Sequence, residues 1–336
     1  MDSHYIVFPT PNQVEVCQEE VGPPGPGQVL CAATKSLISA GTELNCLRGH
    51  FDPGTNWADM MRYPFRPGYS MIARVIEAGP GVTSLKAGDR ITSRTPHSQF
   101  FALAAADAYR IPDGPTDEVA TWARLAGTTQ LGARRAGLQF GESVAVIGLG
   151  ILGQLVVQYM ALAGARRVIA VDLNPQRLAL ARAHGATHAV ATDAASARDA
   201  VAEITAGRML DVVFDVTGHP AVLSAAMGLL HRFGRLVLLG DTPTPTQQVL
   251  GPGVVSNSLA ILGIHGTAHP DAWSELAPWS RPEMLDLFFD YLAQGRMRVA
   301  DLVTHRYAPP DAPAAYDMLL RDPASALGVI LDWTAL

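Results

Sequence analysis

The chain has 336 residues, enough for about two domains of ordinary size. Hydrophobic residues make up 48% of it and charged residues 17%, a balance that excludes an intrinsically disordered chain. The net charge of −6 argues against binding to nucleic acid. The sequence has no apolar run of membrane-spanning length and no signal segment at residues 1–13. We therefore expect a cytoplasmic protein that does not bind a membrane.

Residues 1 to about 125 are rich in glycine, proline and short alternating apolar runs. Runs at 28–34, 70–77 and 89–92 are typical of β-strands, and turns such as 22–27 separate them. We therefore predict a mainly β first domain, built as a partly open barrel.

The cysteines are Cys17, Cys31 and Cys46, which are too few and too scattered for a disulfide framework or a four-cysteine zinc lobe. We expect them to be small buried hydrophobic residues.

From Glu118 the sequence changes to alternating helical and strand patterns. The expected helices lie at 175–184, about 194–206, 220–230 and 282–294, and the expected strands at 211–216, 235–239 and 259–264. This succession predicts an α/β fold, a doubly wound parallel sheet with helices on both faces. A strand at 303–307, a helix at 312–320 and a strand at 326–332 end the chain.

A glycine-rich turn lies near the middle of the chain. The β-branched run 144–147 leads into Gly148-Leu149-Gly150-Ile151-Leu152-Gly153, a helical run follows to residue 163, and a second apolar run ends at Asp172. In this order Gly148 permits the tight turn, Gly150 lets the backbone approach a pyrophosphate, and Gly153 lets the helix pack on the strand. The sequence therefore predicts a dinucleotide-binding turn rather than an ordinary glycine-rich loop.

Asp172 lies at the end of the second strand, where a carboxylate accepts hydrogen bonds from the adenosine ribose and repels a 2′-phosphate. We therefore expect NAD rather than NADP. Leu173 follows as a further cofactor residue. Arg177 either lies over the adenine or is a solvated arginine on a helix face.

Three further stretches follow strands whose carboxyl ends should border the ligand of an open α/β sheet. They are Val216-Thr217-Gly218, Leu239-Gly240-Asp241 and Ile264-His265-Gly266. The last of them is expected to run beside the nicotinamide ring. For all three the alternative is an ordinary glycine-containing turn after a strand.

With its β-rich first domain, GLGILG turn, and GVTSLKAGDR and ALGVILDW stretches, the chain resembles the medium-chain dehydrogenase/reductase superfamily, the relatives of zinc alcohol dehydrogenase and sorbitol dehydrogenase. The resemblance implies a GroES-like catalytic domain (1–126 and 291–336), a Rossmann NAD-binding domain (127–290) and an active site between them. It also implies a homodimer or homotetramer that pairs through the last strand of the Rossmann sheet. Thr129 matches a family threonine that packs on the nicotinamide.

The chain departs from that family at its zinc ligands. The family's cysteine ligand falls in the run 38–43, where this chain has Ala40, and its GHE motif is replaced by Gly68-Tyr69-Ser70. The last ligand position falls at about Arg124 or Leu125. Catalytic zinc needs about three protein ligands, and these positions supply none, so we expect no metal. The SxGTE and PGY runs resemble a zinc-free branch that includes bacteriochlorophyllide dehydrogenase.

Without zinc, a side chain must act as acid/base during hydride transfer. Our candidates are Tyr69 or His97, with Thr42 as the proton relay that matches the family hydroxyl. Asn45 replaces a histidine further along that relay, and Glu43 would orient or charge-tune the group.

Each candidate has a structural alternative. Glu43 is otherwise a carboxylate that caps the turn at 39–43, and Tyr69 otherwise fills the vacated metal space. His97 is otherwise a surface-loop histidine, and His265 is favoured as a backbone spacer.

Two candidates concern the substrate pocket. Arg124 is a possible partner of Glu43. Trp57 belongs to the aromatic and methionine-rich segment 50–66, which forms either the outer wall of the substrate pocket or part of the barrel packing.

These observations favour an NAD-dependent, zinc-independent oxidoreductase that interconverts a secondary alcohol and a ketone. The small-molecule substrate is expected to be a polyol, cyclitol, sugar or natural-product intermediate. An alkene or quinone reductase is the alternative enzyme, and a non-catalytic dinucleotide-binding protein is the alternative from another class.

Overall fold

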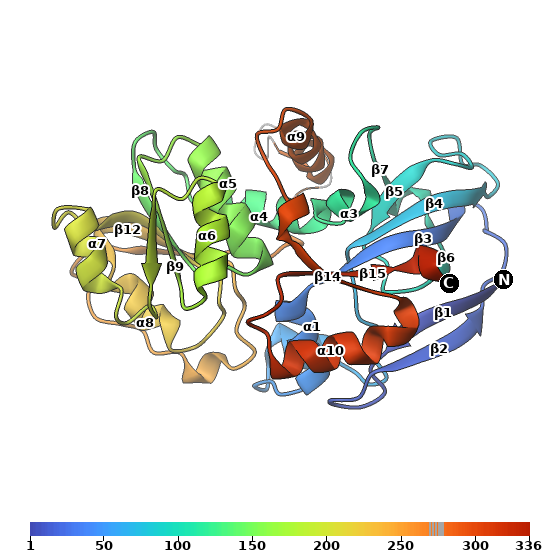
Figure 1. Ribbon diagram of the computed structural model, residues 1–336, viewed down its shortest axis with the longest axis horizontal. Coiled ribbons are helices and arrows are strands. Elements are labelled where there is room, and N and C mark those ends of the chain that lie inside the picture. Colours follow the sequence, from blue (N-terminus) through green and yellow to red (C-terminus); the bar gives the residue numbers. More distant parts are fainter. Residues whose placement is uncertain (269, 271, 273, 275–278) are drawn as a thin grey trace. The chain divides into compact units, whose positions relative to one another are not determined.

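The computed structural model describes all residues except 269, 271, 273 and 275–278, and the chain divides into two compact units (Figure 1). The antiparallel unit comprises Met1–Arg124 and Leu285–Leu336, and the parallel unit comprises Leu125–Met284. The expected domain bounds, 126/127 and 290/291, lie close to this division.

The parallel unit is built on a six-stranded sheet in the order β10-β9-β8-β11-β12-β13, and every pairing in it is parallel. Its strands are β8 (Ser143–Ile147), β9 (Arg167–Asp172), β10 (His188–Ala191), β11 (Leu210–Asp215), β12 (Leu230–Leu238) and β13 (Ala260–Gly263). Its helices are α5 (Ile151–Leu162), α6 (Pro175–Ala183), α7 (Arg198–Ile204) and α8 (Val222–Met227). The expected α/β fold with a parallel sheet is confirmed.

The register of this sheet aligns the carboxyl ends of β8, β9 and β11. Ile147 of β8 is paired with Val171 of β9 on one side and with Asp215 of β11 on the other. Because parallel strands share one direction, the segments that follow these strands all emerge at the same edge of the sheet.

The antiparallel unit contains a seven-stranded sheet, in which β6 pairs with β3 beside the order β14-β15-β3-β4-β5-β7, and the hairpin β1-β2. Its strands are β1 (Asp2–Val7), β2 (Glu15–Glu20), β3 (Gln28–Ile38), β4 (Met71–Ala78), β5 (Arg90–Ser93), β6 (Phe100–Ala104), β7 (Tyr109–Arg110), β14 (Val303–Tyr307) and β15 (Gly328–Asp332). Long β3 pairs with β4, β6 and β15, so the C-terminal strand completes the sheet begun by the first 125 residues.

The helices of the antiparallel unit are α1 (Ala40–Arg48), α2 (Asn56–Met60), α3 (Asp117–Ala120) and α10 (Ala312–Arg321), and a short 3₁₀ helix, η5 (Trp333–Ala335), ends the chain. Two further helices, α4 (Ala123–Arg135) and α9 (Arg281–Ala293), carry the chain from one unit to the other.

Two expectations about local structure are corrected. The run 39–43, expected as a turn, is the first turn of α1, because Ser39 occupies the N-cap position and the Glu43 carboxylate accepts its backbone N–H. Residue 230, expected at the end of a helix, begins β12, because Leu230 pairs with Leu210 before a bulge in the strand.

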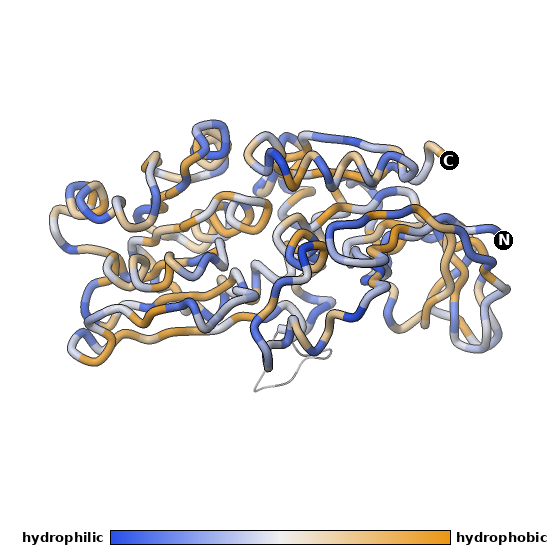
Figure 2. Tube along the Cα trace, turned by 90° about the horizontal axis from the view of Figure 1, so that it is seen from below, coloured by the Kyte–Doolittle hydropathy of each residue, from blue (hydrophilic) through white to orange (hydrophobic). Residues whose placement is uncertain are grey.

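Hydrophobic residues are concentrated along the strands, whereas many turns are hydrophilic (Figure 2). Each unit has its own buried apolar cluster, as expected for two domains. Cys31 and Cys46 are buried as predicted, and Cys17 is half-buried. Among the residues placed by the structure, no helix combines the length and the apolar character needed to cross a bilayer.

Candidate functional site

The glycine-rich turn between β8 and α5 has the geometry that its sequence predicts. Gly148 has φ +87°, a conformation that favours glycine. A Cβ at Gly153 would lie 2.0 Å from the carbonyl oxygen of Gly148, whereas a Cβ at Gly150 would meet no atom within 4 Å. The turn is therefore closed at its base and open at Gly150, which is the space that a pyrophosphate requires.

Asp172 is the last residue of β9, as predicted, and it braces this turn. Its Oδ2 accepts the Leu149 N–H at 2.7 Å, and its Oδ1 accepts the Asn174 N–H at 2.8 Å. The next side chain, Leu173, is 73% exposed, which leaves an apolar surface beside the carboxylate. The end of the strand therefore carries a carboxylate and an exposed apolar side chain, and the contacts of Asp172 and Leu173 with a cofactor stay predictions.

Gln154 is a further residue of this site that the sequence analysis missed. Its side chain is fully buried, and its amide donates to the carbonyl oxygens of Leu149 at 3.3 Å and Arg177 at 2.9 Å. It therefore ties the glycine turn to the first turn of α6. The available signal was a glutamine in an otherwise apolar run, 151–157.

Thr217 lies against the glycine turn from the end of β11. Its backbone N–H and its hydroxyl both donate to Oδ1 of Asp215, at 2.9 and 2.7 Å, and its methyl group lies 2.7 Å from where a Gly148 Cβ would stand. Asp215 is buried, and this burial raises the pKa of its carboxyl group. Asp215 therefore clamps Thr217 onto the turn.

The other predicted cofactor residues of the parallel unit follow its strands. A Cβ at Gly240 would lie 2.3 Å from the Gly218 nitrogen, so the segments after β11 and β12 approach each other closely. Ile264 is buried after β13, whereas His265 is exposed with its Nδ1 2.7 Å from the Thr267 hydroxyl. Thr129 is fully buried in α4, and Leu239 and Ile151 are also buried. Their contacts with a cofactor stay predictions.

In the antiparallel unit, the structure brings three hydroxyl groups together. The Tyr69 hydroxyl lies 2.6 Å from the Ser39 hydroxyl and 3.5 Å from that of Thr42. Burial raises the pKa of Tyr69, the hydrogen bonds of Ser39 and Thr42 act in the opposite direction, and the negative charge of Glu43 raises it further. Tyr69 is therefore kept as a neutral phenol that can donate a proton.

Glu43 and His97 also meet, but in the interior of the unit. Glu43 is 1% exposed and His97 is fully buried, with Nε2 of His97 3.1 Å from Oε2 of Glu43. The other Glu43 oxygen accepts the Ser39 N–H at 2.7 Å, so the capping role considered for Glu43 is present. The surface-loop interpretation of His97 is wrong, because β3 and α1 enclose it through Ser36 and Glu43.

Tyr316 is a member of this buried group that sequence reasoning missed. Its hydroxyl donates to Oε2 of Glu43, and burial together with the Glu43 charge raises the pKa of Tyr316 well above its usual range. Tyr316 lies on α10, 273 residues away in sequence, and nothing in its local pattern distinguishes it from an ordinary core tyrosine.

The remaining substrate candidates have different positions. Trp57 is 6% exposed and stacks on Phe51 with ring centroids 6.0 Å apart, so it packs into the core of the antiparallel unit. This packing is the alternative considered for the segment 50–66. Asn45 is half-buried on α1 and Arg124 is half-buried in α4. The pairing of Arg124 with Glu43 stays a prediction.

The side chains at the family's ligand positions do not fit a catalytic zinc. Ala40 has no donor atom, and Ser70 donates its hydroxyl to the carbonyl oxygen of Thr121 at 2.6 Å. Burial raises the pKa of the Cys31 and Cys46 thiols to about 12, which disfavours the thiolate that binds zinc. In the described part of the chain, no three His, Cys, Asp or Glu side chains are grouped so as to hold a metal.

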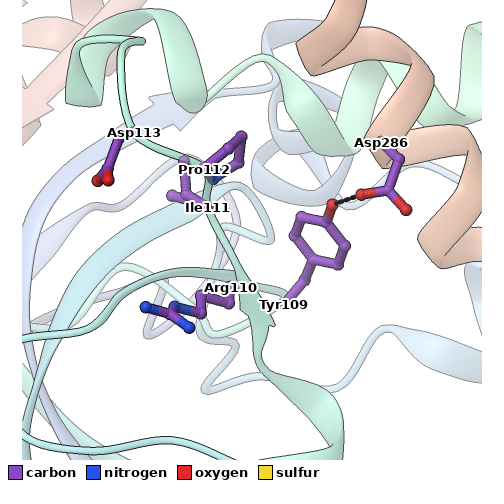
Figure 3. A pocket seen from close by; sticks show the side chains of 6 residues that line it. All are labelled: Tyr109, Arg110, Ile111, Pro112, Asp113 and Asp286. Atoms are coloured by element: carbon purple, nitrogen blue, oxygen red, sulfur yellow. Dashed lines mark hydrogen bonds between the residues drawn. The ribbon is translucent and has the colours of Figure 1, made fainter.

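A surface pocket elsewhere in the antiparallel unit carries a paired tyrosine. The Tyr109 hydroxyl donates to Asp286 of α9, and its ring stacks on Phe289 at 6.1 Å between centroids (Figure 3). Burial and this hydrogen bond raise the pKa of Tyr109. Figure 3 shows Arg110 and Asp113 directed away from the Tyr109–Asp286 pair. We assign this pocket no part in the reaction.

Comparison with known proteins gives a family-model match to part of the chain and sequence and structural matches to nearly all of it. A model of the family described as zinc-binding dehydrogenase matches residues 152–281. The L-threonine 3-dehydrogenase of Burkholderia vietnamiensis is 26% identical over 93% of each chain.

Two solved structures share the fold across nearly the whole chain. A short chain alcohol dehydrogenase from Escherichia coli, complexed with NADH, gives a TM-score of 0.81 at 20% identity over 98% of this chain and 99% of that one. A putative zinc-binding dehydrogenase from Sinorhizobium meliloti, bound to NADP, gives 0.78 at 21% identity over 99% of both. The matches together support an oxidoreductase of the alcohol dehydrogenase type.

The glycine turn yields a paired prediction. Gly153→Ala should lower the free energy of unfolding by about 3 kcal/mol, because the new Cβ meets a backbone oxygen that cannot move freely. Gly150→Ala should cost less than about 1 kcal/mol, because its space is open and its backbone is extended. Urea denaturation of both variants checks this, and equal losses would contradict the geometry described here.

Proposed function

We propose that the chain is an NAD(H)-dependent oxidoreductase that interconverts a secondary alcohol and a ketone by hydride transfer without zinc. The observation that carries the proposal is the Tyr69 hydroxyl, which is held by Ser39 and Thr42 beside positions where zinc enzymes of this type carry metal ligands. The parallel unit would hold the hydride carrier, and the antiparallel unit would manage the proton.

The chemistry divides into a hydride and a proton. Bound NAD accepts the hydride from the alcohol carbon, or NADH returns it to the ketone carbon. Tyr69 acts as the base that takes the alcohol proton, or as the acid that returns it. Thr42 and Ser39 share the proton with Tyr69 and stabilise the charge that develops on the phenol oxygen. Of the two acid/base candidates we favour Tyr69, because both ring nitrogens of His97 are engaged in the interior.

The residues of the parallel unit fit a dinucleotide. Gly150 leaves open space at the start of α5, and the first N–H groups of that helix suit an anion. Asp172 would accept the ribose hydroxyls and Leu173 would contact the adenine ring. In this proposal Thr217, Leu239, Ile264 and Thr129 border the remainder of the cofactor.

The exposed edge of the parallel sheet supports a homodimer. β13 is an edge strand and exposes Ile261, and the segment that precedes it in the chain exposes Val249, Leu250 and Val255. An exposed apolar edge strand is a surface that a second copy can extend. Sedimentation equilibrium tests this, and a monomeric mass at micromolar concentration would exclude it.

The main experiment combines a substrate panel with metal analysis. Secondary alcohols and ketones should be converted at a rate followed by NADH absorbance, and Tyr69→Phe should lower kcat by between about 100-fold and 10,000-fold. Tyr63→Phe, which removes another partly buried phenol oxygen of the same unit, is the matched control.

Three results would overturn parts of the proposal. Stoichiometric zinc, or activity lost on chelation and restored by zinc, would exclude the metal-free mechanism. Reduction of enones with NADPH, and no turnover of alcohols, would favour the alkene or quinone reductase. NADH binding in calorimetry without turnover of any substrate would favour a non-catalytic binding protein.

Cofactor choice has its own prediction. Asp172→Ser should lower the ratio of kcat/KM for NAD to that for NADP at least about 10-fold, because it removes the charge that repels a 2′-phosphate. Glu203→Ser makes the same charge change on α7 and should leave the ratio unaltered. A wild-type enzyme that prefers NADP would exclude this role of Asp172.

A further inference from the structure

A continuous chain of polar side chains crosses the core of the antiparallel unit. It consists of Trp333, Ser36, His97, Glu43 and Tyr316, none of which is more than 2% exposed. These residues come from η5, β3, the segment before β6, α1 and α10, so elements far apart in sequence meet in it. Polar groups this deeply buried are costly unless each finds a partner.

The direction of the hydrogen bonds in this chain follows from the indole N–H of Trp333, which can donate but cannot accept. The Trp333 indole N–H donates to the Ser36 oxygen at 2.9 Å, so the Ser36 hydroxyl is free to donate its own proton to Nδ1 of His97, 2.8 Å away. In this arrangement His97 carries a proton on Nε2 and donates it to Glu43 at 3.1 Å. Every member of the chain is satisfied in this arrangement.

Glu43 is the acceptor at which these hydrogen bonds converge. One oxygen accepts from His97 and from the Tyr316 hydroxyl, and the other accepts the Ser39 N–H at 2.7 Å. A buried carboxylate needs such donors, because its oxygens have lost their contact with water. The chain therefore places a carboxylate with three donors at the start of α1.

Ser39 connects this carboxylate to the proposed acid. Its backbone N–H is held by Glu43, and its hydroxyl lies 2.6 Å from the Tyr69 hydroxyl. A displacement of the Glu43 carboxylate would therefore move Ser39 and loosen its contact with Tyr69. The charged groups that act on Tyr69 are Glu43 from α1 and Arg94, which follows β5.

We propose that Tyr316 and His97 are positioning residues that act through Glu43 and Ser39 to hold the Tyr69 hydroxyl protonated and oriented toward the substrate. This inference rests on the proposed function. In ketone reduction, bound NADH would supply the hydride to the carbonyl carbon and leave as NAD, and the Tyr69 O–H bond breaks as its proton passes to the carbonyl oxygen. Tyr69 then regains a proton from solvent water through the Ser39 and Thr42 hydroxyls.

The negative charge of Glu43 changes the pKa of Tyr69 in one direction. A negative charge near a phenol disfavours the phenolate, so Glu43 raises the pKa of Tyr69. Ketone reduction needs the protonated phenol, and its rate should fall as pH rises through that pKa. Glu43→Gln should move this fall to lower pH.

The first arm of the test measures kinetics of the full-length protein with NADH and the best ketone of the substrate panel. Tyr316→Phe should lower kcat about 10-fold with little change in KM, because it misplaces the acid without touching the substrate. Tyr63→Phe is the matched control, since its hydroxyl donates to the Cys46 carbonyl oxygen on the same helix, α1, and should leave kcat unchanged.

The second arm does not depend on turnover. Carbon-13 label at the tyrosine ring carbon that bears oxygen gives one signal per tyrosine, and Tyr69→Phe identifies the signal of Tyr69. Its titration midpoint should fall in Glu43→Gln and should be unchanged in Tyr63→Phe. Circular dichroism and urea denaturation establish that each variant is folded.

The outcomes separate the two proposals. An active wild type whose Tyr316→Phe and Glu43→Gln variants keep the wild-type kcat and the wild-type Tyr69 midpoint refutes the positioning role alone. A wild type that reduces no ketone refutes the proposed function, and an unshifted midpoint in Glu43→Gln would then refute the inference as well. If Glu43→Gln does not fold, Tyr316→Phe, which removes a single oxygen atom, decides the question.

Discussion

The arrangement of the antiparallel unit depends on the burial of one carboxylate. Glu43 is 1% exposed, and a carboxylate so deeply buried needs hydrogen-bond donors in place of water. The chain supplies them from the backbone of Ser39, from His97 and from Tyr316. These three contacts join helix α1, the segment before β6 and the C-terminal helix α10, and the contact with the Ser39 N–H holds the start of α1.

In the parallel unit, open space lies next to a tightly packed turn between β8 and α5. Gly153 allows α5 to approach β8, and Gly150 leaves its surroundings open. Two side chains hold the backbone of Leu149 in this turn. Asp172 accepts the Leu149 N–H, and Gln154 donates to the Leu149 carbonyl oxygen. The backbone beside the open space is therefore held by two side chains, which in the proposed function would reduce the ordering cost of binding.

At the positions where the resemblance to zinc enzymes implies metal ligands, this chain carries other groups. Ala40 and Tyr69 cannot reproduce a metal cage, and the phenol of Tyr69 instead joins the hydroxyls of Ser39 and Thr42. A fold of this kind hosts different reactions by exchanging the groups at one site, so the site rather than the fold must carry the functional argument.

The sequence by itself determined the class of fold and the turn that suits a dinucleotide. Both depend on local periodicity and on the spacing of glycines, so the strands β8, β9, β11, β12 and β13, the closed turn at Gly148 and the position of Asp172 could be predicted. The short strand β10 was missed, because its four residues carry too little pattern of their own. Only the tertiary structure decided the surroundings of Glu43 and His97 and the inclusion of Tyr316, because their contacts join residues 54 and 273 positions apart. Trp57 shows the same limit, since an aromatic residue in a loop-like segment looks alike whether it faces a ligand or, as here, stacks on Phe51 in the core. Short-range sequence patterns predict local backbone structure. The partner of a buried polar group depends instead on how segments distant in sequence pack together.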